Sequence, residues 1–287
     1  MVKEIIRSLA RPPALALRAL GVTPPEKVFR HLHKVGPFAI ALPDGRGTLQ
    51  LMSWGNRVEN ELFWRGWVGH EPDVMRWWGR LSLDARTVLD VGANTGSFAF
   101  IAKALTPQAT VHAFEPLARI ADRLRENQRV SGLSVEIFQA AVADQTGELP
   151  IHDPGGANAY SASLDPNFLA GDKESYMVPV TTIDAHCATH DLTPDLIKID
   201  VEGLEGRLLL GARDTLAKGQ AVIVCEWTRN SDAHEAARDL LLSCGYVSLD
   251  PATGQTVDLD MGREHAERNV LLCPKDRVDV LKATGPL

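Results

Sequence analysis

The segment LIKIDVEG, residues 196–203, carries charged side chains inside an apolar run. Successive side chains of a strand point to opposite faces, so Lys198, Asp200 and Glu202 would share one face if the strand stays extended to its end. Burying these groups together is costly unless they pair or do chemistry, and we favour a functional role over a purely structural ion pair. A carboxylate or a neutral lysine here could take the proton of an attacking hydroxyl group, a contribution of about 10²- to 10⁴-fold in rate.

A second segment, VLDVGANTGSFAF at residues 88–100, runs from an apolar strand through a glycine turn into a helix. A dinucleotide-binding turn has the pattern G-x-G-x-x-G, whose second glycine lets backbone N–H groups approach a pyrophosphate. Asn94 stands where that glycine would be, between Gly92 and Gly96, so the phosphate cradle is absent. Asp90 would repel a pyrophosphate but attract a cation. A ligand with an ammonium and a sulfonium group therefore fits this turn better than a dinucleotide does.

Glu115 ends the next apolar segment, TVHAFE at residues 110–115. An acid at this point can accept hydrogen bonds from two ribose hydroxyl groups. Together with Asp90 and the glycine turn, it predicts an adenosyl ligand with an amino-acid tail, S-adenosylmethionine. An NAD-linked oxidoreductase is disfavoured by the missing glycine. A catalytically silent adenosyl-binding or scaffold protein is the alternative from another class, and the intact acids Asp90, Glu115 and Asp200 argue against it.

These residues need a sheet to position them. After Ser82, apolar segments of strand length alternate with helical segments, a pattern typical of a doubly wound α/β domain whose mainly parallel sheet is covered on both faces. We place this domain at residues 81–287. Residues 1–80 are predicted to form an N-terminal, mainly helical extension, in which four Trp residues make a packing stripe. Residues 147–185 interrupt the alternation, either as an exposed loop or as a substrate-side insertion that covers the ligand.

The composition of the chain limits which partners and which cellular compartment are expected. The 287-residue chain has a net charge of −7, which argues against a nucleic-acid partner. Four cysteines without metal-type spacing favour a reducing cytoplasm, and the absence of a signal peptide or of eighteen consecutive apolar residues predicts a cytoplasmic chain. Residues 2–20 are basic and partly apolar. They are expected to dock on the domain as a short helix, with weak contact to an anionic membrane surface as the alternative.

The motifs resemble those of class I S-adenosylmethionine-dependent methyltransferases and, more narrowly, of the FkbM family. The resemblance is carried by VLDVGANTGSFAF, by HAFEP at residues 112–116, by AVADQTGEL at residues 141–149 and by DLIKIDVEGLEGRLLLGA at residues 195–212. The last motif is the most specific, because glycine turns after strands occur in many folds.

The resemblance implies a Rossmann-like sheet of seven strands with the last antiparallel, a bound S-adenosylmethionine, and an acceptor hydroxyl on a sugar, glycolipid or polyketide. Carried over by motif, it implies a cofactor site made of Asp90, Gly92, Asn94 and Gly96 at the methionine end, Glu115 at the ribose, and Ala141 and Val142 beside the adenine. The chain is thus expected to be an S-adenosylmethionine-dependent O-methyltransferase with a small-molecule or glycan acceptor.

Asp200 is the first candidate for the base of this reaction, with Lys198 or Glu202 as alternatives. Glu226 follows the next strand, and Asp200 with Glu226 could instead hold Mg²⁺, which we do not favour. Two histidines are also singled out. His70 is expected to border the acceptor site, whereas His112, inside an apolar strand, is expected to be a packed core residue.

Overall fold

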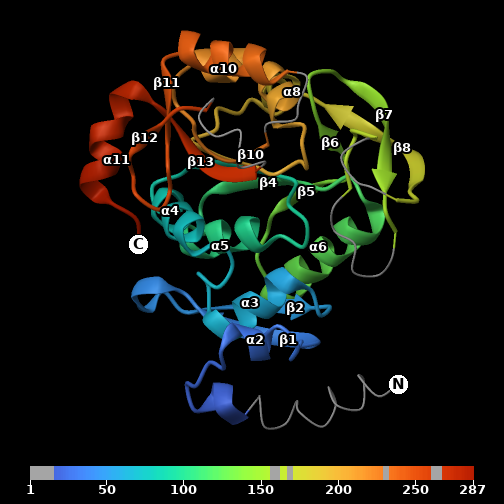
Figure 1. Ribbon diagram of the computed structural model, residues 1–287, viewed down its shortest axis with the longest axis vertical. Coiled ribbons are helices and arrows are strands. Elements are labelled where there is room, and N and C mark those ends of the chain that lie inside the picture. The colour runs from blue at the N-terminus through green and yellow to red at the C-terminus, as the bar shows by residue number, and fades with distance from the viewer. Residues whose placement is uncertain (1–15, 156–161, 167–170, 229–232, 260–266) are drawn as a thin grey trace.

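The computed structural model describes residues 16–155, 162–166, 171–228, 233–259 and 267–287. Its centre is an eight-stranded sheet in the order β12-β11-β13-β10-β9-β3-β4-β5 (Figure 1). The strands are β3 (Thr87–Val91), β4 (Thr110–Phe114), β5 (Glu136–Phe138), β9 (Leu196–Ile199), β10 (Val222–Thr228), β11 (Tyr246–Leu249), β12 (Thr256–Val257) and β13 (Glu267–Pro274).

The pairing confirms the predicted doubly wound, Rossmann-like sheet. Strands β5, β4, β3, β9 and β10 run parallel to one another, whereas β13 runs antiparallel to both β10 and β11. The eighth strand, β12, is one more than the seven expected. It lies at the edge of the sheet, where it pairs with β11. With two residues, this strand is too short to give a periodic pattern in the sequence.

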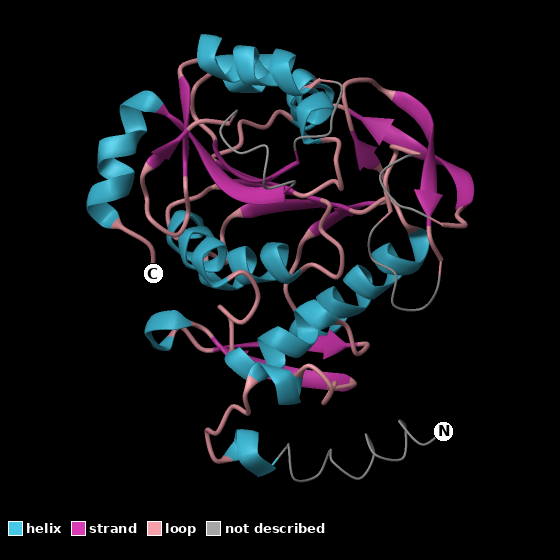
Figure 2. Ribbon diagram, viewed as in Figure 1, coloured by secondary structure: helices cyan, strands magenta, loops and turns pink. Residues whose placement is uncertain are grey.

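Helices cover both faces of the sheet (Figure 2). Successive apolar residues of a strand point to opposite faces, and they belong to two different apolar clusters. Val88 packs on one face and Leu89 on the other. On the Val88 face lie α4 (Pro72–Ser82), α5 (Ser97–Leu105) and α6 (Ala118–Ser131), with α11 (Val278–Thr284) beside them. On the Leu89 face lie α7 (Ile183–His190), α8 (Glu205–Leu210), α9 (Arg213–Ala217) and α10 (His234–Ser243).

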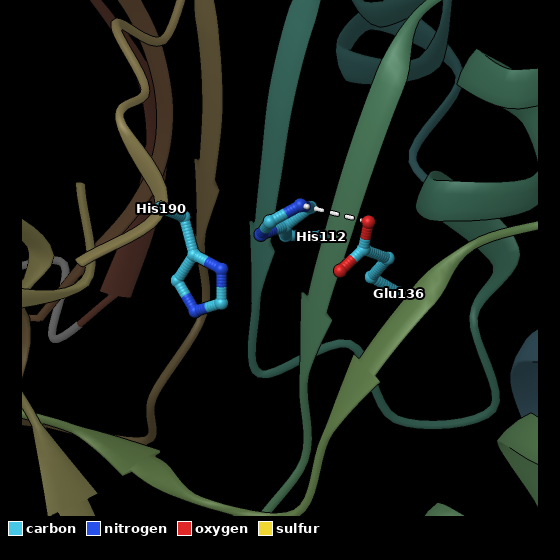
Figure 3. Close-up of side chains that lie close together, drawn as sticks. All are labelled: His112, Glu136 and His190. Atoms are coloured by element: carbon cyan, nitrogen blue, oxygen red, sulfur yellow. Dashed lines mark ion pairs between the residues drawn. The ribbon is translucent and has the colours of Figure 1, made fainter.

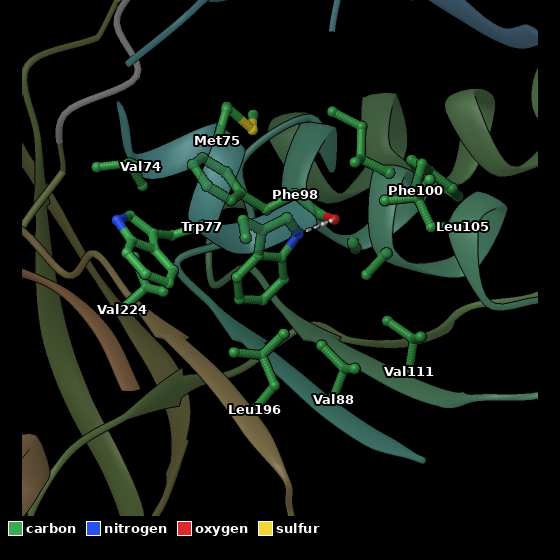
Figure 4. Packing of buried hydrophobic residues seen from close by; sticks show 14 of the residues in the cluster. Val74, Met75, Trp77, Val88, Phe98, Phe100, Leu105, Val111, Leu196 and Val224 are labelled. Atoms are coloured by element: carbon green, nitrogen blue, oxygen red, sulfur yellow. Dashed lines mark hydrogen bonds between the residues drawn. The ribbon is translucent and has the colours of Figure 1, made fainter. Parts of the chain in front are cut away.

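The described part of the N-terminal extension contains strands that the sequence analysis did not predict. It comprises α2 (Glu26–Phe29), β1 (Gly36–Ala41), the 3₁₀ turn η1 (Pro43–Gly45), β2 (Thr48–Ser53), α3 (Arg57–Arg65) and α4, and β1 pairs with β2 as an antiparallel hairpin. The Trp stripe packs as expected. The Trp78 Nε1–H donates to the Phe98 carbonyl at 2.9 Å, and Trp78 is fully buried. It belongs to the same apolar cluster as Trp77 and Phe98, which are labelled in Figure 4. The extension therefore shares one apolar core with the sheet.

The insertion is not a simple loop. Gly147–Asp153 forms β7 and Glu174–Thr181 forms β8, which make a three-stranded sheet with β6 (Ala141–Val142). Ile151, Val178 and Val180 bury a small apolar cluster against the start of α6. This packing places the insertion beside the carboxyl end of the central sheet.

Most of the basic segment at residues 2–20 lies outside the described residues. Within the described part, Arg18 contacts the N-terminal extension itself: its guanidinium group lies 4.0 Å from the Phe63 ring centre and donates to the Ala39 carbonyl at 2.7 Å. Among the described residues, no helix combines the length and the apolar character needed to cross a membrane.

Candidate active site

A cavity of about 910 Å³, including its open mouth, lies at the carboxyl ends of β3, β4 and β9. Ligands bind at this edge in open α/β sheets. The loops after these strands contribute to its wall, together with β6, the insertion and the N-terminal extension. Of the residues predicted for cofactor and catalysis, seven line the cavity: Gly92, Asn94, Glu115, Ala141, Val142, Asp200 and Glu202.

The glycine turn is shaped by close contacts of the backbone. Gly92 has a φ of 78°, and an added Cβ would lie 1.7 Å from the Asp200 carbonyl oxygen, so no side chain fits there. At Gly96, which does not line the cavity, a Cβ would lie 2.3 Å from Leu124 Cδ1. Gly96 therefore serves the close packing of the turn against α6.

Asp90 lies behind the turn. Its side chain is buried, and its Oδ2 accepts the Ala99 N–H in the first turn of α5 at 2.8 Å. Burial raises the pKa of Asp90 to about 7, although the charge of Lys198 acts in the opposite direction. The contact fixes the start of α5, and Asp90 itself is not part of the cavity wall.

Glu115 is held in one orientation at the cavity wall. Its Oε2 accepts the Asn94 N–H at 3.1 Å and its Oε1 accepts the Leu117 N–H at 2.9 Å. Burial raises the pKa of Glu115 to about 7, and the two backbone donors counteract part of that shift. Each carboxylate oxygen keeps a second lone pair, so Glu115 can accept two more hydrogen bonds from a ligand.

Lys198 and Asp200 form an ion pair at the edge of the cavity. Lys198 Nζ lies 3.2 Å from Asp200 Oδ2, and Lys198 is 1% exposed whereas the Asp200 side chain is 33% exposed. Burial alone would raise the pKa of Asp200, but Lys198 and a hydrogen bond with Glu226 outweigh it and lower that pKa. For Glu226, burial and the adjacent Asp200 charge raise the pKa to about 9. Asp200 is therefore the anion of the pair, and Glu226 is the protonated acid that donates to it.

This charge arrangement bears on the Mg²⁺ alternative. Asp200 and Glu226 do meet, as the neighbouring strands β9 and β10 predicted. However, a buried ammonium group 3.2 Å from Asp200 already supplies positive charge and would repel a divalent cation on the same carboxylate. The pair thus matches a shared proton better than a metal site.

Glu202 departs from the predicted alternation. Strand β9 ends at Ile199, and Glu202 has a φ of 55°, in the left-handed region. Its carbonyl accepts the Ser163 hydroxyl at 2.7 Å. The strand therefore does not stay extended to Glu202, so the condition under which Glu202 would share a face with Lys198 and Asp200 is not met, although Glu202 still lines the cavity.

A histidine and its partners complete the site. His70 lines the cavity, and its Nδ1 lies 2.8 Å from Glu61 Oε2. Glu61 Oε1 accepts from Arg57 Nε at 2.8 Å. The pairing of Glu61 with His70 was not predicted, and the Arg57 to Glu61 spacing of one helical turn in α3 is the signal that could have drawn attention to it.

Replacing Glu226 by Gln should change how stability depends on pH. The pKa of Glu226 is about 9 in the folded chain and about 4.3 in the unfolded chain. Between these pH values the folded state binds one more proton than the unfolded state. The free energy of unfolding therefore falls as pH rises through this range. Glutamine removes that contribution. In urea unfolding between about pH 6 and pH 8.5, Glu226→Gln should lose less stability than the wild type, and the exposed Glu235→Gln should match the wild type. Equal slopes in all three proteins would contradict a protonated Glu226.

The chain is similar to known methyltransferases. The Methyltransferase FkbM domain matches residues 90–248. The 2-O-methyltransferase NoeI of Sinorhizobium fredii is 30% identical over 46% of this chain and 59% of its own length. The hexuronic acid methyltransferase AglP of Haloferax volcanii is 29% identical over 54% of this chain and 61% of its own length. The chain thus spans less than two thirds of either relative.

Among solved structures, methyltransferase FkbM from Methylobacillus flagellatus KT aligns with a TM-score of 0.41 and 16% identity, over 66% of this chain and 44% of that one. The matched family domain contains the glycine turn, Glu115 and the Lys198 to Asp200 pair, and it covers more than half of the sequence. The chain therefore belongs to the FkbM methyltransferase family.

Proposed function

We propose that this protein transfers the methyl group of S-adenosylmethionine to a hydroxyl group of a sugar-containing acceptor. The observation that carries the proposal is one continuous cavity wall that includes Glu115, fixed by two backbone N–H groups, together with Asp200 and His70. One relative is named as a hexuronic acid methyltransferase and another as a 2-O-methyltransferase. The first name supports a sugar, and the second an oxygen acceptor, among the sugar, glycolipid and polyketide acceptors that the family resemblance implies.

The residues present fit this cofactor. Glu115 has free lone pairs for ribose hydroxyl groups, and Leu117, Val142 and Ile151 supply an apolar wall for an adenine. The turn at Gly92 and Asn94, held from behind by Asp90, would take the methionine end.

When bound, S-adenosylmethionine supplies a methyl group on a positively charged sulfur, which becomes a neutral thioether as the methyl moves to the acceptor oxygen. That oxygen must lose its proton as the new bond forms. Asp200, kept anionic by Lys198, can accept the hydrogen bond of the hydroxyl group and orient it. A carboxylate stabilised in this way is a weak proton acceptor, so we assign the final proton acceptance to another group.

His70 is that group in our proposal. Its Nδ1 donates to Glu61, so the tautomer presents a lone pair on Nε2, and imidazole is the commonest general base in enzymes. The hydroxyl proton goes to His70 Nε2, and Glu61 stabilises the resulting cation. Glu202, which also lines the cavity, is assigned to acceptor binding.

Calorimetric titration of the purified protein with S-adenosylmethionine, beside NAD⁺, tests the cofactor. We expect micromolar binding of S-adenosylmethionine and no heat with NAD⁺. A folded protein that binds neither would contradict the proposal and favour a scaffold protein. Binding of NAD⁺ alone would favour an oxidoreductase.

A further inference from the structure

A second polar cluster lies on the same strand as the cavity wall but away from the cavity. His112 precedes Phe114 by two residues in β4, and Glu136 of β5 is its register partner. His186 and His190 come from α7, one helical turn apart. We call these four residues the histidine cluster. None of the four belongs to the cavity wall.

The histidine cluster has the geometry of a ligand set. The ligand-capable atoms of His112, Glu136 and His190 all lie within 4.8 Å of one another. His112 Nε2 is 3.6 Å from Glu136 Oε1, and the rings of His112 and His190 are perpendicular with centres 5.4 Å apart. In Figure 3, His112 lies between the other two side chains, which reach it from different elements.

His112 is oriented from behind by a second imidazole. Its Nδ1 lies 2.8 Å from His186 Nε2, so one of these nitrogens carries the proton and the other accepts it. When His112 Nδ1–H is the donor, His112 Nε2 presents a lone pair beside the carboxylate of Glu136. Metal-binding histidines usually donate their second ring N–H to a carboxylate, a backbone carbonyl or a water, which fixes both tautomer and ring. His186 Nε2 would take the place of that acceptor here.

The three ligand residues differ in burial: His112 is held in the core, whereas the side chains of Glu136 and His190 are free to rotate at the surface. His112 is 2% exposed, which confirms the expected core position, whereas Glu136 and His190 are exposed. Zinc bound at about 2.0 to 2.2 Å in a tetrahedron needs ligand atoms about 3.4 Å apart. Rotation of the two exposed side chains can close the remaining distance without moving the strands.

We propose that His112, Glu136 and His190 bind a divalent transition metal of the zinc type, with water as a fourth ligand. Two imidazoles and one carboxylate are a donor set that suits zinc, and three protein ligands leave one position open. The metal would tie the end of α7 to strands β4 and β5. Since it would bind the folded chain only, it should raise the thermal unfolding midpoint.

The test uses the full chain without a histidine tag, stripped with a chelator and then titrated with Zn²⁺ or Co²⁺. We expect one equivalent of Zn²⁺ in calorimetry, a visible Co²⁺ absorption band typical of four-coordinate sites, and a higher unfolding midpoint. His190→Ala and Glu136→Gln should each weaken binding by about 100-fold or more. Both change exposed side chains, so the fold should be retained.

His31→Ala is the matched control, since His31 is exposed and lies outside the histidine cluster. It should bind Zn²⁺ as the wild type does. Equal binding in the wild type and in all three variants would show that the metal binds elsewhere on the chain and would overturn the proposal. Absence of stoichiometric binding in the wild type would also overturn it. None of these three readouts depends on methyl transfer.

Discussion

His70→Gln should lower kcat by about 10²- to 10⁴-fold, the usual contribution of a general base. Glutamine can still hydrogen-bond to Glu61, but it cannot take up a proton. Because His70 is assigned to proton transfer, the affinity for S-adenosylmethionine should change little. Steady-state kinetics, combined with calorimetric binding of the cofactor, would separate the two effects. The exposed His31→Gln should leave both values unchanged.

Asp200→Asn, compared with His70→Gln, tests whether Asp200 or His70 is the general base. Asparagine keeps an acceptor oxygen for the hydroxyl group but loses the negative charge that pairs with Lys198. If Asp200 orients the hydroxyl group and His70 takes the proton, both variants lose turnover. Loss of turnover in Asp200→Asn together with normal turnover in His70→Gln would contradict the role of His70 and return the base to Asp200.

Glu115→Ala should weaken S-adenosylmethionine binding by at least about 100-fold, because two hydrogen bonds to a charged acceptor are lost at about 1.5 to 3 kcal/mol each. The pKa of about 7, raised by burial, adds a pH dependence. Protonation removes acceptor capacity, so wild-type affinity should fall as pH drops from about 8 to about 6. Calorimetric titrations at several pH values measure both effects.

Glu115→Gln is the matched control, since it keeps one acceptor oxygen and the shape of the side chain. Its affinity should lie between those of the wild type and Glu115→Ala, and the part of the pH dependence due to Glu115 should disappear. Because Glu115 also accepts two backbone N–H groups, the unfolding midpoint of each apo variant must be compared with that of the wild type. Unchanged affinity in a folded Glu115→Ala protein would contradict the ribose assignment.

The sheet and the cofactor end of the site were predictable because they depend on local patterns. Two-sided apolar strands such as Thr87–Val91 require helices on both faces, and the turn after β3 needs Gly92 because the chain of β9 passes against it. Glu115 follows the same logic, since it stands directly after a strand whose end must reach the same edge of the sheet.

The reacting end depends on contacts between distant segments, which a local pattern does not contain. The charge of Asp200 is set by Lys198 and by Glu226 from another strand. The backbone at Glu202 is no longer extended, because β9 ends earlier than its alternation of residue types suggests. His70 meets its partner Glu61 only because the chain folds back between α3 and α4.

The extension was misread for a different reason. The residues of β1 and β2 do alternate, with Phe38 and Ile40 buried opposite Leu49 and Leu51. The turns rich in Pro and Gly around them, and the helical Trp-rich stretch that follows, favoured a mainly helical segment. The hairpin is stabilised by packing on α6, a contact that only the tertiary fold creates.

The most direct measurement of the central claim is the mass of a sugar acceptor after incubation with the protein and S-adenosylmethionine. A panel of free and glycosidically linked uronic acids and neutral sugars should include an acceptor that gains one methyl group on a hydroxyl oxygen, with S-adenosylhomocysteine formed in equal amount. The product should be strongly reduced with His70→Gln. A protein that binds S-adenosylmethionine but methylates no hydroxyl group of the panel, or that methylates nitrogen or carboxylate oxygen instead, would contradict the account.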